Sequence, residues 1–123
     1  MTLQNPEAEA FFSVREAHSD VAEVFVASLE RLGEYELRHA PAHSGYGAIY
    51  AITKGIVFCG VAGGLQSYWR LRPHDFDTAL STGADRAPIG PEWVTITSFR
   101  NDWPQPDLPF WALRAYDYAR MGI

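Results

Sequence analysis

A cluster of glycines in the middle of the chain limits most strongly what this polypeptide can fold into. The stretch FCGVAGGLQSYWRLRP, residues 58–73, places Gly63-Gly64 between two segments rich in apolar and aromatic residues. Two adjacent glycines tolerate the positive φ angles that a two-residue type I′ hairpin turn requires. The stretch therefore predicts two antiparallel strands joined at Gly63-Gly64.

Counting outward from this turn gives the expected register of the hairpin. It pairs Ala62 with Leu65 and Phe58 with Trp69, and the resulting face is strongly apolar. A slip by one residue would move every side chain to the other face, which favours this register. The opposite face combines apolar and polar side chains, namely Val57, Cys59, Val61, Gln66, Tyr68 and Arg70. We expect the N-terminal helix or a second copy of the chain to cover that face.

The same glycines could instead belong to a phosphate-binding loop. A Walker loop needs a Lys followed by Ser or Thr after its last glycine, whereas Leu65-Gln66 follows here. The dinucleotide spacing G-x-G-x-x-G is also absent. The hairpin is therefore the favoured interpretation.

The flanking sequence supplies the other predicted elements. Helix-capping residues and a period near 3.6 predict helices that begin at Asn5-Pro6 and near Ser19-Asp20, one capped by His74 or Asp75, and one capped by Asp107. Alternation and β-branched or aromatic residues predict strands over 35–39, 46–53, 56–62, 65–71 and 92–99. Lys54-Gly55 is expected to form a tight turn. The predicted order is two helices, four strands, a helix, a strand and a helix.

Length and charge limit the class of protein. The 123 residues fit a single domain over 1–123, in which 1–18 form an N-terminal helical extension. A net charge of −5 disfavours nucleic acid and anionic membranes as partners, because binding to either depends on basic side chains. No basic start with an apolar run and no membrane-length apolar stretch is present, so we expect a cytoplasmic location.

Cys59 is the only cysteine and the first candidate for catalysis. A nucleophilic cysteine needs a nearby base, and the possible bases His39, His43 and His74 are all distant in sequence. A free cysteine in a strand is more often a small apolar filler. We therefore expect no catalytic residue and no cofactor, with Cys59 kept as a candidate ligand-binding residue.

Two histidines, His39 and His43, have a spacing that could suggest a metal site. Such spacing brings both rings to one face only on a helix, and Pro41 and Gly45 predict a loop here. We therefore expect no metal. The glutamates of the N-terminal half are typical of a solvated helix face, namely Glu7, Glu9, Glu16, Glu23 and Glu30.

Aromatic and basic side chains could form a recognition surface. Tyr46, Arg70 and the segment Asp102-Trp103-Pro104 could make a polar, aromatic rim, since aromatic residues beside an arginine recognise partners well. The alternative is that Trp103 only attaches its loop to the core. Tyr68 is a further candidate, on the half-covered hairpin face.

The segment from Gly45 to Arg120 resembles the small domains grouped as TfoX N-terminal-like and MmcQ/YjbR-like. The resemblance rests on GYGAIY, GIVFCGVAGG, WRLRP, ALSTGA, GPEWVTI and WALRAYDYAR. A domain of unknown function associated with the luciferase name has a similar ending. The resemblance implies a two-layer α+β fold, an antiparallel sheet of about five strands with helices packed mainly on one face, similar to secretion chaperones. It implies no catalytic residues.

Some of those relatives carry a DNA-binding label or a link to competence regulation. This chain departs from them because it is acidic and lacks the second domain of full-length TfoX-like regulators, so both labels are disfavoured for it.

Three functions are compatible with the sequence. The first is a non-catalytic binding or adaptor domain, because aromatic residues are abundant and no catalytic constellation is found. The second is a small-molecule-binding protein or minor enzyme with a pocket near Cys59 and Arg70. The third, less favoured, is a nucleic-acid-binding regulator. We also expect self-association as a twofold homodimer, the commonest closed assembly of soluble proteins.

Overall fold

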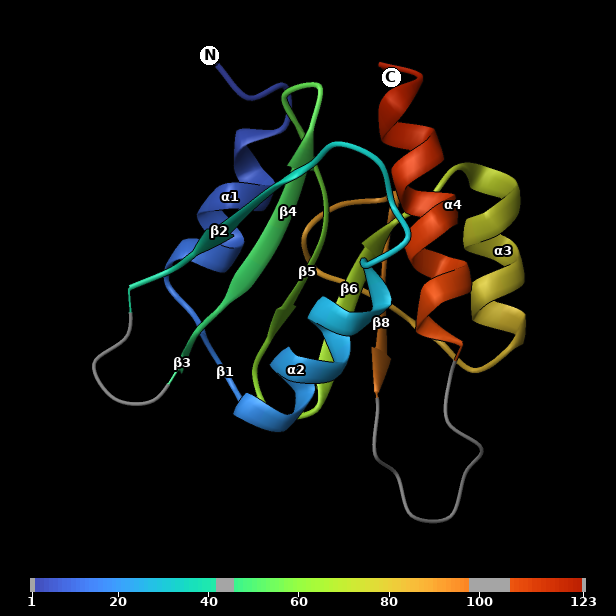
Figure 1. The fold of residues 1–123 in the computed structure, drawn as a ribbon. Helices are drawn as coiled ribbons and strands as arrows, with labels where there is room; N and C mark the ends of the chain where they lie inside the picture. The colour runs from blue at the N-terminus through green and yellow to red at the C-terminus, as the bar shows by residue number, and fades with distance from the viewer. Residues whose placement is uncertain (1, 42–45, 98–106, 123) are drawn as a thin grey trace.

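The computed structural model describes residues 2–41, 46–97 and 107–122, and every structural statement below concerns these residues. They form an α+β fold of four helices, an antiparallel sheet of six strands and a smaller sheet of two strands (Figure 1). The predicted fold class is therefore confirmed. No described helix combines the length and the apolar character that crossing a membrane requires.

The helices are α1 (Pro6–Ser13), α2 (Ser19–Ser28), α3 (Pro73–Ser81) and α4 (Leu108–Arg120). The large sheet has the order β2 (Glu36–His39), β4 (Ile49–Thr53), β5 (Ile56–Ala62), β6 (Gln66–Arg70), β8 (Trp93–Thr97) and β7 (Asp85–Arg86). The small sheet pairs β1 (Glu16–Ala17) with β3 (Tyr46–Gly47). All four predicted helices are present, and so are the predicted strands, except that the one expected over 46–53 is divided into β3 and β4, which belong to different sheets. The two-residue strands β1, β3 and β7 are too short to carry an alternating pattern.

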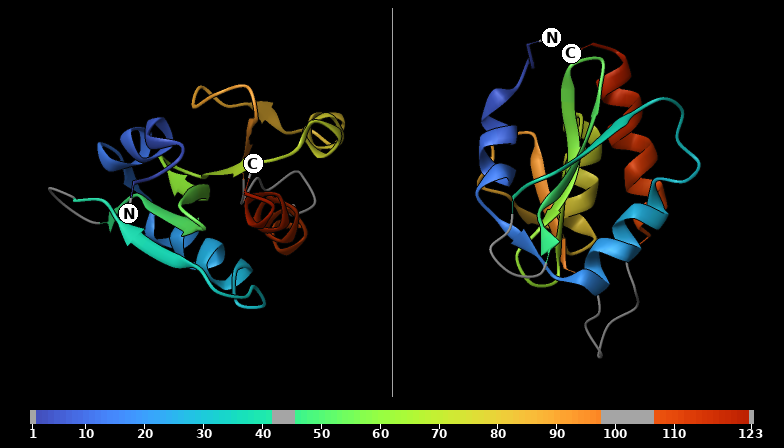
Figure 2. Two further views of the ribbon diagram at one scale, coloured as in Figure 1. Left: turned by 90° about the horizontal axis from the view of Figure 1, so that it is seen from above. Right: turned by 60° about the vertical axis from the view of Figure 1, so that its left-hand side comes forward.

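Helices lie on both faces of the large sheet, three on one and one on the other. Residues of α2, α3 and α4 share a core cluster with one face of the strands, around Phe25, Phe58 and Trp69. The opposite face forms a second cluster with Ala8 and Phe12 of α1. Figure 2 shows α1 separated from α2 and α4 by the sheet. The helices thus pack mainly on one face, as predicted, and α1 covers the other.

The glycine hairpin exists, but its predicted register is wrong. β5 and β6 pair Ala62 with Gln66 and Cys59 with Trp69, so three residues rather than two form the connection. Only Gly63 has a positive φ, +76°, whereas both glycines were expected to. The register argument assumed one exposed face, yet every residue of β5 is buried. With both faces apolar, alternation cannot distinguish one register from the next.

The type I′ turn lies one hairpin earlier. Thr53 pairs with Ile56, and the two residues between them, Lys54 and Gly55, have φ values of 51° and 74°. Positive φ at both central positions defines this turn type. The tight turn predicted at Lys54-Gly55 is confirmed.

A β-bulge in β5, in its pairing with β4, adds a separate error in the face assigned to each side chain. On β4, the neighbours Ala51 and Ile52 pair with Cys59 and Val57, which leaves Phe58 as the extra residue. Phe58 and Cys59 consequently belong to the same core cluster although they are adjacent in sequence. A bulge interrupts the two-residue period, so a count along the sequence assigns the wrong face beyond it.

The helix α1 is held to the sheet by Asn5 and Phe12. Asn5 was predicted to cap α1, but its side chain makes no cap hydrogen bond. Instead its Nδ2 donates to the Val57 carbonyl at 2.8 Å and its Oδ1 accepts from the Val57 N–H at 2.9 Å. A Cβ on Gly60 would lie 2.4 Å from the Phe12 ring, so only glycine leaves room for it.

Of the other predicted helix caps, the one at α4 is confirmed and the one at α3 is wrong. Asp107 caps α4 as expected, with its Oδ1 accepting from the Phe110 N–H at 3.2 Å. Neither His74 nor Asp75 caps α3, because the helix begins at Pro73 after Arg72. Proline is well suited to this first helical position, since its ring presets φ and it has no N–H to satisfy.

Candidate functional site

The structure separates the candidate residues that the sequence proposed. Cys59 and Tyr68 are buried in different core clusters, and Arg70 is 6% exposed in an ion pair. Tyr46 is 54% exposed on β3. Trp103 lies outside the described residues, as do the rest of its loop and His43. No described hydrogen bond or ion pair connects these candidates to one another.

Cys59 has the environment of a core residue. Its side chain is fully buried among the residues of the larger core cluster, and this burial raises the pKa of the thiol well above its ordinary value. A nucleophilic cysteine requires the opposite, an environment that stabilises the thiolate. The described residues also hold no group of three or more His, Cys, Asp and Glu side chains placed to bind a metal.

Arg70 belongs to a buried polar network with Glu92 and Tyr118. Its Nε donates to Glu92 Oε2 at 2.8 Å, and the Tyr118 hydroxyl donates to Glu92 Oε1 at 2.8 Å. The guanidinium carbon lies 4.4 Å from the centre of the Tyr118 ring. Burial, followed by the Glu92 hydrogen bond, raises the pKa of Tyr118. The network connects β6 to α4 and to the residue before β8, which gives Arg70 a structural role.

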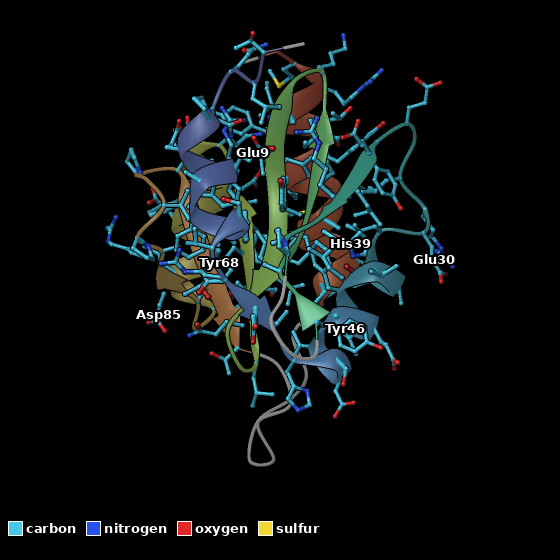
Figure 3. The ribbon with its side chains drawn as sticks, turned by 90° about the vertical axis from the view of Figure 1, so that its left-hand side faces the viewer. Glu9, Glu30, His39, Tyr46, Tyr68 and Asp85 are labelled. Carbon is cyan, nitrogen blue, oxygen red and sulfur yellow. The ribbon has the colours of Figure 1, made fainter. Side chains whose placement is uncertain are left out.

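Tyr68 lies beneath α1 and is only 6% exposed (Figure 3). Its ring centre is 5.1 Å from that of Phe11 and 5.8 Å from that of Phe12, both in edge-on geometry. The side chains expected to share one hairpin face are in fact divided between the two core clusters, because Val57 and Tyr68 lie with α1 whereas Cys59 and Val61 lie on the opposite side of the sheet. The face that contains Tyr68 is covered by the N-terminal helix, one of the two covers that the sequence allowed.

A second polar network joins α1 to the large sheet. Glu9 accepts from Arg38 Nη1 at 2.6 Å and from the Tyr50 hydroxyl at 3.0 Å, and Arg38 also pairs with Glu36. These contacts connect α1 to β2 and β4. Charged side chains on β2, an edge strand, also disfavour the addition of a further strand there.

Tyr46 is a sequence candidate that lines a groove. A shallow groove of about 330 Å³ runs along α2, with Tyr46 and Ile49 on its other side. Figure 3 places Tyr46 beside α2 and Glu30 past the end of that helix. The remaining lining residues come from α2 and the turn after it, namely Ser19, Ala22, Glu23, Val26, Ala27 and Glu30.

The wall formed by α2 combines apolar and acidic side chains. Ser19, Glu23 and Val26 follow one another at steps of four and three residues, which places them on one face of α2, and Glu30 lies in the turn after the helix. Glu23 and Glu30 are exposed, and neither forms an ion pair with another described residue. The negative end of the helix dipole adds to the charge of Glu30, which follows the last turn of α2.

The groove can therefore bind an apolar group and one or two cations, and nothing within the described chain neutralises its glutamates. The sequence predicts a solvated helix face for Glu23 and Glu30 and indicates no binding role for Ile49. The signal that could have found the groove is the helical spacing of Ser19, Glu23 and Val26. That spacing does not reveal that β3 lies alongside, since a two-residue strand has no pattern of its own.

No protein-family model, curated protein or solved structure matches this chain. The resemblance to TfoX N-terminal-like and MmcQ/YjbR-like domains stays a prediction.

Proposed function

We propose that the protein is a binding or adaptor domain that works without catalysis, and that the groove along α2 is where its partner docks. The observation that carries this proposal is the composition of the groove wall. Exposed Tyr46 and half-buried Val26 lie beside two glutamates that no described residue pairs. Every other cluster of charged side chains described above joins two elements of the fold.

Charge complementarity indicates the chemistry of the partner. A segment with an apolar side chain between two Lys or Arg residues would satisfy Ile49 and Val26 and neutralise Glu23 and Glu30. The Tyr46 ring can add a cation–π contact to one of those basic groups. The net charge of −5 favours the approach of a basic partner as well.

The experiment is partner capture from the native host with three forms of the tagged protein. Glu23→Lys/Glu30→Lys reverses both groove charges, and Asp77→Lys/Asp85→Lys makes the same change in net charge at exposed positions on α3 and β7. We expect a partner that the wild type and the α3/β7 variant retain and that the groove variant loses. A partner retained equally by all three forms would contradict the proposal.

The alternative of a small-molecule site or minor enzyme near Cys59 and Arg70 gains no support. The fully buried thiol with its raised pKa and the engaged guanidinium both have structural roles. The acidic composition continues to disfavour nucleic acid. A cytoplasmic location stays a prediction.

We further propose that the chain forms a homodimer, through a surface other than the one first expected. The Tyr68 face is occupied by α1, so Tyr68→Asp would destabilise the monomer rather than separate a dimer. Three large apolar side chains on or just after α4 are exposed instead, Phe110, Leu113 and Met121. Sedimentation over a concentration series tests the dimer: the mass should rise above 13.8 kDa, and a constant mass would contradict it.

A further inference from the structure

The outer face of α4 carries an apolar stripe that the described residues of the chain leave exposed. Phe110, Leu113 and Met121 are 40%, 50% and 57% exposed, although the opposite face of the helix contributes Trp111 and Ala115 to the core. Arg114 and Asp117 are exposed as well. At 3.6 residues per turn all five outer residues fall on one side of the helix, because Met121 continues its helical geometry.

The order of residues along this stripe is self-complementary. Phe110 lies as far before the midpoint between Ala115 and Tyr116 as Met121 lies after it, and the same is true of Arg114 and Asp117. Two such helices packed antiparallel around a twofold axis at that midpoint would bring unlike residues together. At each end of the contact, Phe110 of one copy would lie against Met121 of the other. On each side of the axis, Arg114 of one copy would lie against Asp117 of the other.

We propose that α4 is the interface of a twofold dimer, in which Arg114 of each copy pairs with Asp117 of the other. This inference rests on the homodimer proposed above and specifies its geometry. Phe110 packs against Met121 of the second copy, and Leu113 fills the space between its Asp117 and Met121. An isologous contact of this kind closes on itself at two copies.

Existing contacts are compatible with this pairing. The Arg114 guanidinium lies 5.0 Å from the centre of the Phe110 ring, which holds it over the stripe. Asp117 forms no ion pair with another described residue. The stripe carries one charge of each sign, so a second copy neutralises it, whereas a strongly charged partner would not.

The size of the stripe sets the expected strength of the dimer. Its helix is about 20 Å long at 1.5 Å per residue, which places the interface among small, weak ones. We therefore expect dissociation in the micromolar range or above, so that dilution separates the copies.

Charge reversal tests the geometry by sedimentation of single and mixed variants. Arg114→Asp places two carboxylates opposite each other, and Asp117→Arg places two guanidinium groups opposite each other, so each variant alone should be monomeric. Mixed in equal amounts, the two should form a heterodimer, because every cross-pair is then Asp with Arg. Asp77→Arg on α3 makes the same charge change as Asp117→Arg, but outside the stripe, and this variant should dimerise like the wild type.

Each other outcome contradicts a specific part of the proposal. A wild type that stays monomeric at hundreds of micromolar rejects the dimer altogether. A dimeric wild type whose single variants also dimerise keeps the homodimer and rejects α4 as its interface. Monomeric single variants whose mixture also stays monomeric reject the antiparallel twofold pairing. Circular dichroism spectra that match the wild type establish that each variant is folded.

Discussion

Gly63 has a backbone conformation that residues with a side chain adopt only at a cost. Its φ is +76°, whereas Gly64 is not in that region and has open space where a Cβ would lie. We expect Gly63→Ala to lower the free energy of unfolding by about 1–2 kcal/mol and Gly64→Ala to change it by less than about 0.5 kcal/mol. Urea unfolding of both variants measures the difference. An equal effect at the two positions would contradict the turn geometry.

Cys59 is expected to be inert as long as the protein is folded. Its thiol is fully buried and its pKa is raised by that burial, so a thiol reagent should modify it only at the rate of unfolding. Cys59→Ser should cost about 1–3 kcal/mol of stability, because a buried hydroxyl needs a hydrogen-bond partner. Partner capture by the folded variant should be unchanged. Rapid labelling under native conditions would show that the thiol is accessible and would revive the enzyme hypothesis.

At the scale of elements, the attachment of α1 depends on Asn5. Removing its amide with Asn5→Ala leaves the N–H and the carbonyl of Val57 without the partners they have now. We expect a loss of roughly 2–4 kcal/mol from two buried backbone groups. Gln4→Ala is the control, since Gln4 is exposed and its side chain makes one long hydrogen bond, 3.4 Å, to Lys54. Thermal unfolding compares the two, and an equally mild effect would refute the anchoring role of Asn5.

The elements also differ in how far the sequence could predict them. Periodicity located the helices and the five longer strands, because each has enough residues to show a 3.6- or two-residue repeat. It failed on the hairpin register, since both faces of β5 are buried, and it assigned the wrong face beyond the bulge at Phe58, which reverses the alternation. Of the groove, only Tyr46 was proposed as a binding residue. The groove depends on β3 lying beside α2, and a contact between distant segments leaves no local pattern.

At the scale of the whole molecule, the burial of tyrosine and cysteine side chains predicts a loss of stability at alkaline pH. Burial raises the pKa of Tyr35, Tyr50, Tyr68 and Tyr118 above 10.0 and that of Cys59 above 9.0. In the unfolded chain these groups ionise near those ordinary values, whereas in the folded protein they ionise only at higher pH. The unfolded state is therefore favoured increasingly as the pH rises.

This alkaline effect can be measured by urea unfolding at a series of pH values. We expect the free energy of unfolding that these groups contribute to be constant below about pH 8 and to fall above about pH 9. Tyr118→Phe should reduce the steepness of that fall, because it removes one of the buried phenols. A midpoint that does not change between pH 8 and pH 10.5 would contradict the burial of these groups.

The central claim is that a partner docks in the groove along α2, and hydrogen exchange on the protein with its captured partner tests it most directly. We predict slower amide exchange over 19–30 and 46–49 when the partner is bound, with little change in α1 and around Cys59 and Arg70. Protection confined to α1 or to the segments that contain Cys59 and Arg70, with α2 unchanged, would contradict the account.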